Sequence, residues 1–365
     1  MNIKHQTIKK FLLKIIISFA LLLSATLAKD QGINISAPVE NDSTITKEEA
    51  GTRQLKYALM FNNSEKLNSL LFINPTVKIP NKPSGFLLDD GTTWFYESDL
   101  NHYKLAVMAG VVLSAEAYGY YRLKDMWYNW ETGKLHSINF NVDFEKYLWM
   151  DKYGHFLHAY FASGLFTRGY RWAGMSGENS ILYGSISGWL WMLQIEIAYG
   201  FFEQWGFSWG DLIANTVGAG FSALQQVYPD ALGGIQPKIS YQPSEALKGK
   251  KYINDTKTAI DDYEGMTFWL AVNAYHYMPK NIQDGYPELL KPLGLAVGHS
   301  AKGISVNPQG GYREIFIGLD YDLRKLSLGD ESSLIRFLKN ELNIIRLPLP
   351  AVKITPDGIW YGLYF

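Results

Sequence analysis

The spacing of apolar residues changes along the chain, from runs of helical length to alternation with period two. This change limits the fold more than any other feature of the sequence. Four apolar runs between residues 104 and 228 are each of helical length and rich in glycine, alanine and serine. Beyond residue 265 the apolar residues alternate with period two, which is typical of strands with one apolar face. We therefore predict an α+β fold, with a central bundle of apolar, small-residue-rich helices followed by a C-terminal antiparallel β-sheet.

Small residues in the four apolar runs favour close helix packing, because they let two helix backbones approach each other. A helix that spans a bilayer requires about 20 mainly apolar residues. The third run has this length, whereas the others are short or interrupted by charge. We expect a tightly packed or membrane-associated bundle, and membrane-spanning helices are the alternative. The runs cover residues 104–121, 155–172, 181–202 and 211–228.

The N-terminus has the layout of a secretory signal peptide. A basic segment is followed by an apolar run that ends in a small residue, Ala28, before polar sequence. We expect residues 1–28 to be the signal peptide, with an uncleaved anchor as the alternative, and residues 29–100 to be a polar leader and loop region. The sequence contains no cysteine, which excludes disulfides and a lipid-modified N-terminal cysteine. These features predict a location in the bacterial cell envelope, in the periplasm or at the outer membrane.

Composition divides the rest of the chain into three parts. We predict a helical domain over 101–236, a polar linker over 237–264 and an antiparallel β region over 265–365 that ends in an aromatic strand. Within the β region, strands are expected at 266–278, 293–301, 313–323 and 358–365, and a helix at 333–345. His299 lies where a strand meets a turn, and we expect it to face solvent.

Charge and aromatic content narrow the range of partners. The net charge is −1, from 34 basic and 35 acidic residues, so nucleic acid is not expected as a partner. Aromatic residues make up 15% of the chain, and such rings suit membrane interfaces as well as large cores. We expect membrane or envelope lipid as a partner, and an envelope protein is a further candidate.

Ionisable and amide side chains interrupt the apolar runs at helical spacing. Asp151 and His155 are four residues apart, as are Asp211 and Asn215, so each pair shares one helix face. Glu196 lies in the third run, and Glu203 would share its face if the helix continues. Antiparallel packing would bring these faces together in apolar surroundings, where burial shifts pKa values. The candidate catalytic residues are His155, Asp151, Lys152, Glu196, Asp211 and Asn215.

Three uses of this constellation stay open. His155, Glu196 and Asp211 would suit zinc, manganese or iron, but no compact ligand motif is present, so metal and cofactor are left unassigned. Alternatively, His155 would act as a general base while Lys152 binds a phosphate or polarises an ester. In the third reading the carboxylates pair with His155, Lys152 or Arg168 and fix the register of the helices.

The position of Asp211 can also be explained by a structural role in helix capping, without catalysis or metal binding. Ser208 is placed in the N-cap region of a helix that starts near residue 210, with Asp211 in its first turn. An acid in the first turn interacts favourably with the helix dipole.

Two motifs carry a resemblance to a known family. "DKYGH" at 151–155 together with "GFSWGDLIANTVGAG" at 206–220 resembles the YfiM-like family of predicted periplasmic proteins of unknown function. The order Asp-Lys-x-x-His, Glu, Asp-x-x-x-Asn is more distantly similar to the VanZ-like membrane proteins linked to glycopeptide (teicoplanin) resistance. The resemblance covers roughly residues 145–230 and implies an envelope protein, often tethered by lipid, with no established reaction. The chain departs from it in having no cysteine and in Tyr199, where the relatives have an acid.

These observations lead to one expected function and one alternative. We expect a bacterial cell-envelope protein, associated with the outer membrane and facing the periplasm, whose buried polar cluster holds a helical bundle and which binds lipid or a partner protein. The alternative is a hydrolase or transferase that acts on an envelope lipid or lipid-linked glycan with the His/carboxylate site. The sequence does not decide whether the protein is an enzyme.

Overall fold

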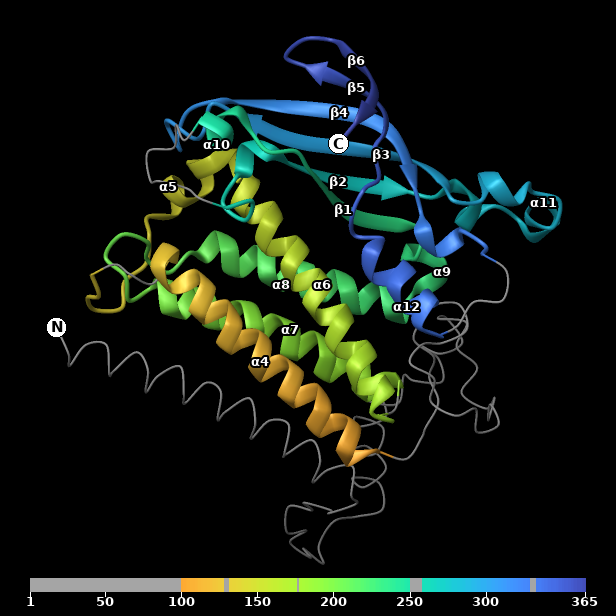
Figure 1. Ribbon diagram of the computed structural model, residues 1–365, viewed down its shortest axis with the longest axis horizontal. Helices are drawn as coiled ribbons and strands as arrows, with labels where there is room; N and C mark the ends of the chain where they lie inside the picture. The colour runs from red at the N-terminus through yellow and green to blue at the C-terminus, as the bar shows by residue number, and fades with distance from the viewer. Residues whose placement is uncertain (1–99, 128–130, 176, 250–257, 329–332) are drawn as a thin grey trace, which may run out of the picture. The chain divides into compact units, whose positions relative to one another are not determined.

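The computed structural model describes residues 100–127, 131–175, 177–249, 258–328 and 333–365 (Figure 1). The predicted signal peptide, and the predicted leader up to residue 99, lie outside the described residues.

The helical part confirms all four predicted runs (Figure 1). Short helices precede α6 and follow α8: α5 at Phe140–Glu145, the 3₁₀ helix η1 at Lys146–Trp149 and α9 at Pro229–Leu232. No helix in the described ranges combines the length and the apolar character needed to cross a membrane. Among the described residues, the four long helices are α4 (His102–Trp127), α6 (Met150–Trp172), α7 (Gly177–Tyr199) and α8 (Trp209–Val227).

The C-terminal part is a six-stranded antiparallel sheet in the order β1-β2-β3-β4-β5-β6, which confirms the predicted α+β fold (Figure 1). Short helices α10 (Glu245–Gly249) and α11 (Lys280–Gln283) lie between strands, and α12 (Ser333–Leu342) precedes β5. The strands are β1 (Ile235–Tyr241), β2 (Met266–Val272), β3 (Leu293–Lys302), β4 (Tyr312–Tyr321), β5 (Leu349–Thr355) and β6 (Ile359–Tyr364).

Two of these strands differ from the sequence prediction. Residues 237–241 of the predicted linker belong to β1, and β5 was not expected. β1 alternates apolar residues with Gln236, Lys238 and Ser240, and all three polar side chains are buried. The polar residues and the proline that suggest a linker in the sequence therefore belong to a strand whose inner face is polar. β5 contains Pro350 and is followed by a second proline. Because proline is uncommon within strands, the alternation of side chains in this segment does not indicate a strand in the sequence.

Glycine allows α6 and α7 to pack closely, as the small residues predicted. A Cβ atom on Gly188 of α7 would lie 2.5 Å from the backbone nitrogen of Ser163 in α6. One turn earlier, a Cβ on Gly184 would lie 2.6 Å from the Cα of Thr167. Real Cβ atoms do not approach backbone this closely, so glycine is required at both positions for the observed packing.

An apolar core joins α6 to one end of the sheet. Phe268 of β2 stacks against Tyr153 of α6, with ring centroids 5.9 Å apart. His299 lies in the same contact, 4.9 Å from the Tyr153 ring, and both of its ring nitrogens are buried. The expectation that His299 faces solvent is therefore wrong, because α6 covers this end of β3. The buried members of this core are Met150, Leu157, Met266, Phe268, Ala301 and Ile304.

Candidate functional site

The candidate residues come together from three helices. Their side chains meet near the first turns of α6 and α8 and the last turns of α7. Asp151, Lys152 and His155 come from α6, Glu196 from α7, and Asp211 and Asn215 from α8.

Lys152 is the centre of one half of this cluster. Its Nζ atom lies 2.6 Å from Asp143 Oδ1, 3.0 Å from Asp151 Oδ2 and 2.9 Å from Asp211 Oδ1. All four side chains are largely or fully buried. Three carboxyl groups therefore surround one ammonium group, which compensates the cost of burying its charge.

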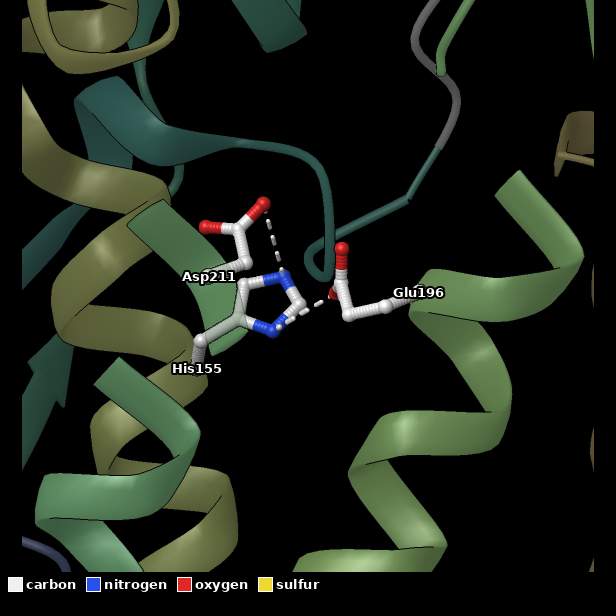
Figure 2. A group of neighbouring side chains, drawn as sticks. All are labelled: His155, Glu196 and Asp211. Carbon is white, nitrogen blue, oxygen red and sulfur yellow. Dashed lines mark ion pairs between the residues drawn. The ribbon is translucent and has the colours of Figure 1, made fainter. Parts of the chain in front are cut away.

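His155 is the centre of the other half, where its ring lies between two carboxyl groups (Figure 2). Its Nδ1 atom lies 3.3 Å from Glu196 Oε1 and 3.2 Å from the amide oxygen of Asn215. Its Nε2 atom faces Asp211 Oδ2 at 3.8 Å. Asp211 thus links the two halves, with Oδ1 toward Lys152 and Oδ2 toward His155.

The start of α8 confirms the predicted cap. The Ser208 hydroxyl accepts a hydrogen bond of 2.9 Å from the backbone nitrogen of Asp211, and donates to the carboxylate of Asp143. Asp143 also accepts from the backbone nitrogen of Gly210 at 2.9 Å. The N-terminus of α8 is therefore tied to Lys152 through Asp143.

Asp143 belongs to the site but was missed in the sequence. It is fully buried in the short helix α5, which has no apolar repeat to mark it. The only available signal is its place eight residues before Asp151. Other ionisable residues lie apart from the cluster: Glu203 is exposed beyond the end of α7, and Arg168 pairs with Glu341 of α12.

The backbone immediately before α6 is strained. Tyr147, Leu148 and Trp149 have φ angles of 55°, 50° and 73°. Residues with a Cβ rarely adopt this left-handed region, and each costs on the order of 1–3 kcal/mol. The turn sets the direction in which α6 starts, and so the positions of Asp151 and Lys152.

The pKa values in the Lys152 half reflect burial and mutual charge. Burial, reinforced by Asp211, raises the pKa of Asp151 to about 7, although Lys152 opposes the change. For Asp211, burial alone would raise the pKa, but His155, Lys152 and hydrogen bonds outweigh it and lower the value. The position of Asp211 in the first turn of α8 acts in the same direction through the helix dipole.

Glu196 and His155 are shifted toward their neutral forms. Burial, with the nearby charge of Asp211, raises the pKa of Glu196 well above its usual value, while Lys152 and the backbone of Ser208 oppose the rise. Burial likewise lowers the pKa of His155, and Lys152 adds to this while Asp211 and Asn215 oppose it. Glu196 also lies near the C-terminus of α7, where the helix dipole disfavours negative charge.

The fold and the site define a class of protein: an α+β protein whose helical bundle contains a buried network of ion pairs and hydrogen bonds. Residues 140–227 match the family model described as predicted periplasmic lipoprotein (DUF2279). The match runs from the start of α5 to the end of α8, so it contains the entire cluster. It confirms the predicted location in the bacterial cell envelope. No curated protein and no solved structure matches the chain.

Proposed function

We propose that this protein is an envelope component that associates with membrane lipid through one face of its C-terminal sheet, on the periplasmic side of the outer membrane. In this proposal the buried polar cluster keeps α6, α7 and α8 in fixed register and has no catalytic task. The relation to the YfiM-like family, and more distantly to the VanZ-like membrane proteins, is part of the same proposal. The observation that supports it most is the inverted distribution of side chains on the sheet, where aliphatic side chains are exposed on one face and charged side chains are buried on the other.

Large aliphatic side chains form rows on one face of the sheet. Leu270 pairs with Val297, Val297 with Ile317, and Ile317 with Val352, so these residues lie side by side across four strands. A second row runs from Val272 through Leu295 to Leu319. We call these seven residues the apolar rows. Their exposed fractions range from 36% for Val352 to 62% for Leu295.

The opposite face of the same strands is buried and contains charges. Lys238 pairs with Asp320 at 2.8 Å, and Lys353 with Glu314 at 2.9 Å. The guanidinium of Arg346 lies 3.9 Å from the centre of the Trp269 ring. The sheet thus has charges inside and aliphatic side chains outside. In the described part of the chain, α6 packs against one end of the outer face through Tyr153 and Phe268.

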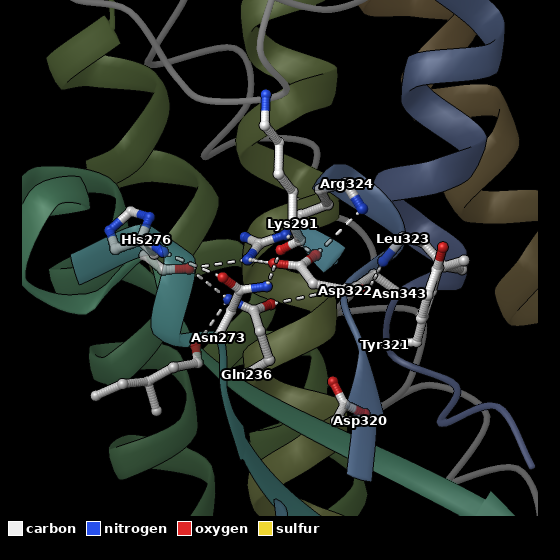
Figure 3. Close-up of polar contacts among 12 residues, drawn as sticks. Gln236, Asn273, His276, Lys291, Asp320, Tyr321, Asp322, Leu323, Arg324 and Asn343 are labelled. Atoms are coloured by element: carbon white, nitrogen blue, oxygen red, sulfur yellow. Dashed lines mark hydrogen bonds and ion pairs between the residues drawn. The ribbon is translucent and has the colours of Figure 1, made fainter. Parts of the chain in front are cut away.

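The polar interior extends to the loop that follows β4. Asn343 donates to Gln236 at 3.2 Å and accepts from the backbone nitrogen of Leu323 at 2.9 Å (Figure 3). Next to it, Asp322 and Arg324 form an ion pair of 2.7 Å (Figure 3). Buried polar groups at these positions are paired, as folded proteins require, so the inverted pattern is a property of the fold.

Lipid explains this pattern better than water does. A contiguous exposed aliphatic surface is unfavourable in water and marks an interaction site. Strands that face acyl chains carry apolar side chains outward and polar side chains inward. In the apolar rows, aliphatic side chains lie side by side across four strands, an arrangement that suits hydrocarbon better than a polar protein surface. The sequence also has no cysteine to carry the lipid named in the family's description, so lipid contact through the fold supplies another mode of attachment.

Flotation with phosphatidylcholine vesicles tests the proposal on a matched pair of valines. Val297, 54% exposed, lies in the apolar rows, whereas Val306, 61% exposed, lies in the loop between β3 and β4. We expect Val297→Asp to reduce the vesicle-bound fraction of the full chain at least about tenfold, because a charge must then enter hydrocarbon, and Val306→Asp to leave it unchanged. Equal binding by both variants, with unchanged thermal midpoints, would overturn the proposal.

The enzymatic alternative is tested by a different measurement. A hydrolase or transferase would use His155 as general base, and its two carboxyl contacts suit that role. Lys152, however, has three carboxyl partners and no spare charge for a phosphate. Turnover of a lipid-linked glycan that disappears in His155→Gln, at unchanged thermal midpoint, would favour the enzyme over the structural role.

A further inference from the structure

Glu196 is the group in the cluster whose environment is least complete. Its side chain is fully buried. A ring nitrogen of His155 lies 3.3 Å from Oε1 and the backbone of Ser208 also acts on the carboxyl group, but within the described residues neither oxygen accepts a hydrogen bond of normal length and angle. The amide nitrogen of Asn215, also fully buried, is without a partner there as well. A buried carboxyl group without partners is costly and rare in folded proteins. Apart from these two approaches, its environment in the described part of the chain lacks a well-placed donor or a positive charge paired with it.

The charges around Glu196 indicate which kind of partner is needed. Four carboxyl groups, of Asp143, Asp151, Asp211 and Glu196, lie in the cluster. Lys152 pairs with the first three of them, and the charge of Lys146 also acts on the same three. Glu196 instead faces the His155 ring, with Nδ1 3.3 Å from Oε1. An additional cation on this side would supply the positive charge that an ionised Glu196 lacks.

The side chains around Glu196 also have a metal-binding composition. His155, Glu196 and Asp211 each offer one ligand atom, and these atoms lie within 4.8 Å of one another (Figure 2). Lys152 uses Asp211 Oδ1, which leaves Oδ2 directed toward His155. One imidazole and two carboxylates suit zinc and neighbouring first-row divalent metals.

A second set of three acidic residues in the cluster already has a cationic partner, Lys152. Asp143, Asp151 and Asp211 also lie within 4.8 Å of one another, but the Lys152 ammonium pairs with all three of them at 2.6–3.0 Å. The ammonium group therefore occupies the place that a cation would take. A metal cation is therefore expected on the His155 side of the cluster and not on the Lys152 side.

We propose that His155, Glu196 and Asp211 bind a divalent transition-metal cation that joins α6, α7 and α8. The cation supplies the partner that Glu196 lacks and adds a link among the three helices that the polar network holds. The site lies in the helical bundle and does not depend on lipid association, so loss of vesicle binding and loss of metal binding are separate outcomes.

Zinc binding to the full chain tests the site. The protein is treated with chelator, and its thermal midpoint and zinc affinity are then measured with added Zn²⁺. We expect one zinc ion per chain and a raised midpoint in the parent. In Glu196→Gln and His155→Gln, zinc affinity should fall at least about tenfold. His158→Gln is the matched control, since His158 lies on the same helix, is exposed, and contacts the Gly154 carbonyl oxygen.

A measurement on the parent protein alone guards against variants that fail to fold. Co²⁺ bound by a nitrogen and carboxylate oxygens in a low-symmetry site absorbs more strongly in the visible range than aqueous Co²⁺. We expect such bands in the parent, and their displacement by Zn²⁺. The absence of these bands, or zinc affinity in folded His155→Gln equal to that of the parent, would overturn the proposal.

Discussion

Gly218 of α8 lies directly against the backbone of Phe156 in α6. A Cβ atom at Gly218 would lie 3.0 Å from the carbonyl carbon of Phe156 and closer still to its oxygen. Gly220, two residues further along α8, has nothing within 4 Å of the same position. Glycine at 218 is therefore required for the close packing of α6 and α8. At 220 it has no such role and only lowers the helix propensity of α8.

Alanine substitutions at these two positions should have opposite effects. Gly218→Ala must push α8 away from α6, and we expect it to lower the free energy of unfolding by about 1–3 kcal/mol. Gly220→Ala adds helix propensity without a clash and should raise it by up to about 1 kcal/mol. Urea unfolding of both variants measures the difference. Equal effects would show that α6 and α8 do not approach as closely as described.

Asp143→Asn tests the part of the network that sequence reasoning missed. The substitution keeps the shape of the side chain but removes a buried charge 2.6 Å from Lys152 Nζ. Breaking a buried pair from one side costs about 3–5 kcal/mol, and the remaining carboxylates of Asp151 and Asp211 should reduce this to about 2 kcal/mol. Asp284→Asn, at an exposed position, is the control and should be neutral. A thermal midpoint equal to that of the control would contradict a structural role for Asp143.

His299 should make stability depend on pH. Burial, with the positive charge of Arg313, lowers the pKa of His299 from 6.5 to about 4. Between these values the unfolded chain binds a proton that the folded protein does not, so stability is complete above pH 6.5 and falls as the pH drops toward 4. Screening at the partly exposed ring limits the loss at pH 5 to about 1 kcal/mol.

The non-titrating variant His299→Phe isolates this contribution. It retains an aromatic ring against Tyr153 but binds no proton, so its free energy of unfolding should fall less than that of the parent between pH 7.5 and pH 5. Chemical unfolding at the two pH values provides the comparison. A parallel decline in both proteins would show that His299 is accessible to protons in the folded state.

The helical half of the fold and most of the site follow from the sequence. Apolar runs with small residues define α6, α7 and α8, and the four-residue spacings of Asp151 with His155 and of Asp211 with Asn215 set the faces that meet. Ser208 marks the start of α8 because its hydroxyl is needed to cap the helix.

The rest depends on contacts that no local pattern encodes. Asp143 joins the site only because the turn at Tyr147–Trp149 directs α6 past α5. On the sheet, the period of two correctly placed Phe268 and Leu270 on one face, but α6 covers Phe268 and leaves Leu270 exposed. Alternation shows which residues share a face, and only the packing of the helices shows how far that face is buried.

Lipid contact by the apolar rows is tested most directly with a fluorescent probe on the sheet itself. The chain has no cysteine, so Val297→Cys and Val306→Cys each provide a single labelling site for a polarity-sensitive dye. When phosphatidylcholine vesicles are added, we predict a blue-shifted and brighter emission from the label at 297 and an unchanged spectrum from the label at 306. Unchanged emission at 297 in the presence of vesicles would contradict the assignment of the apolar rows to lipid.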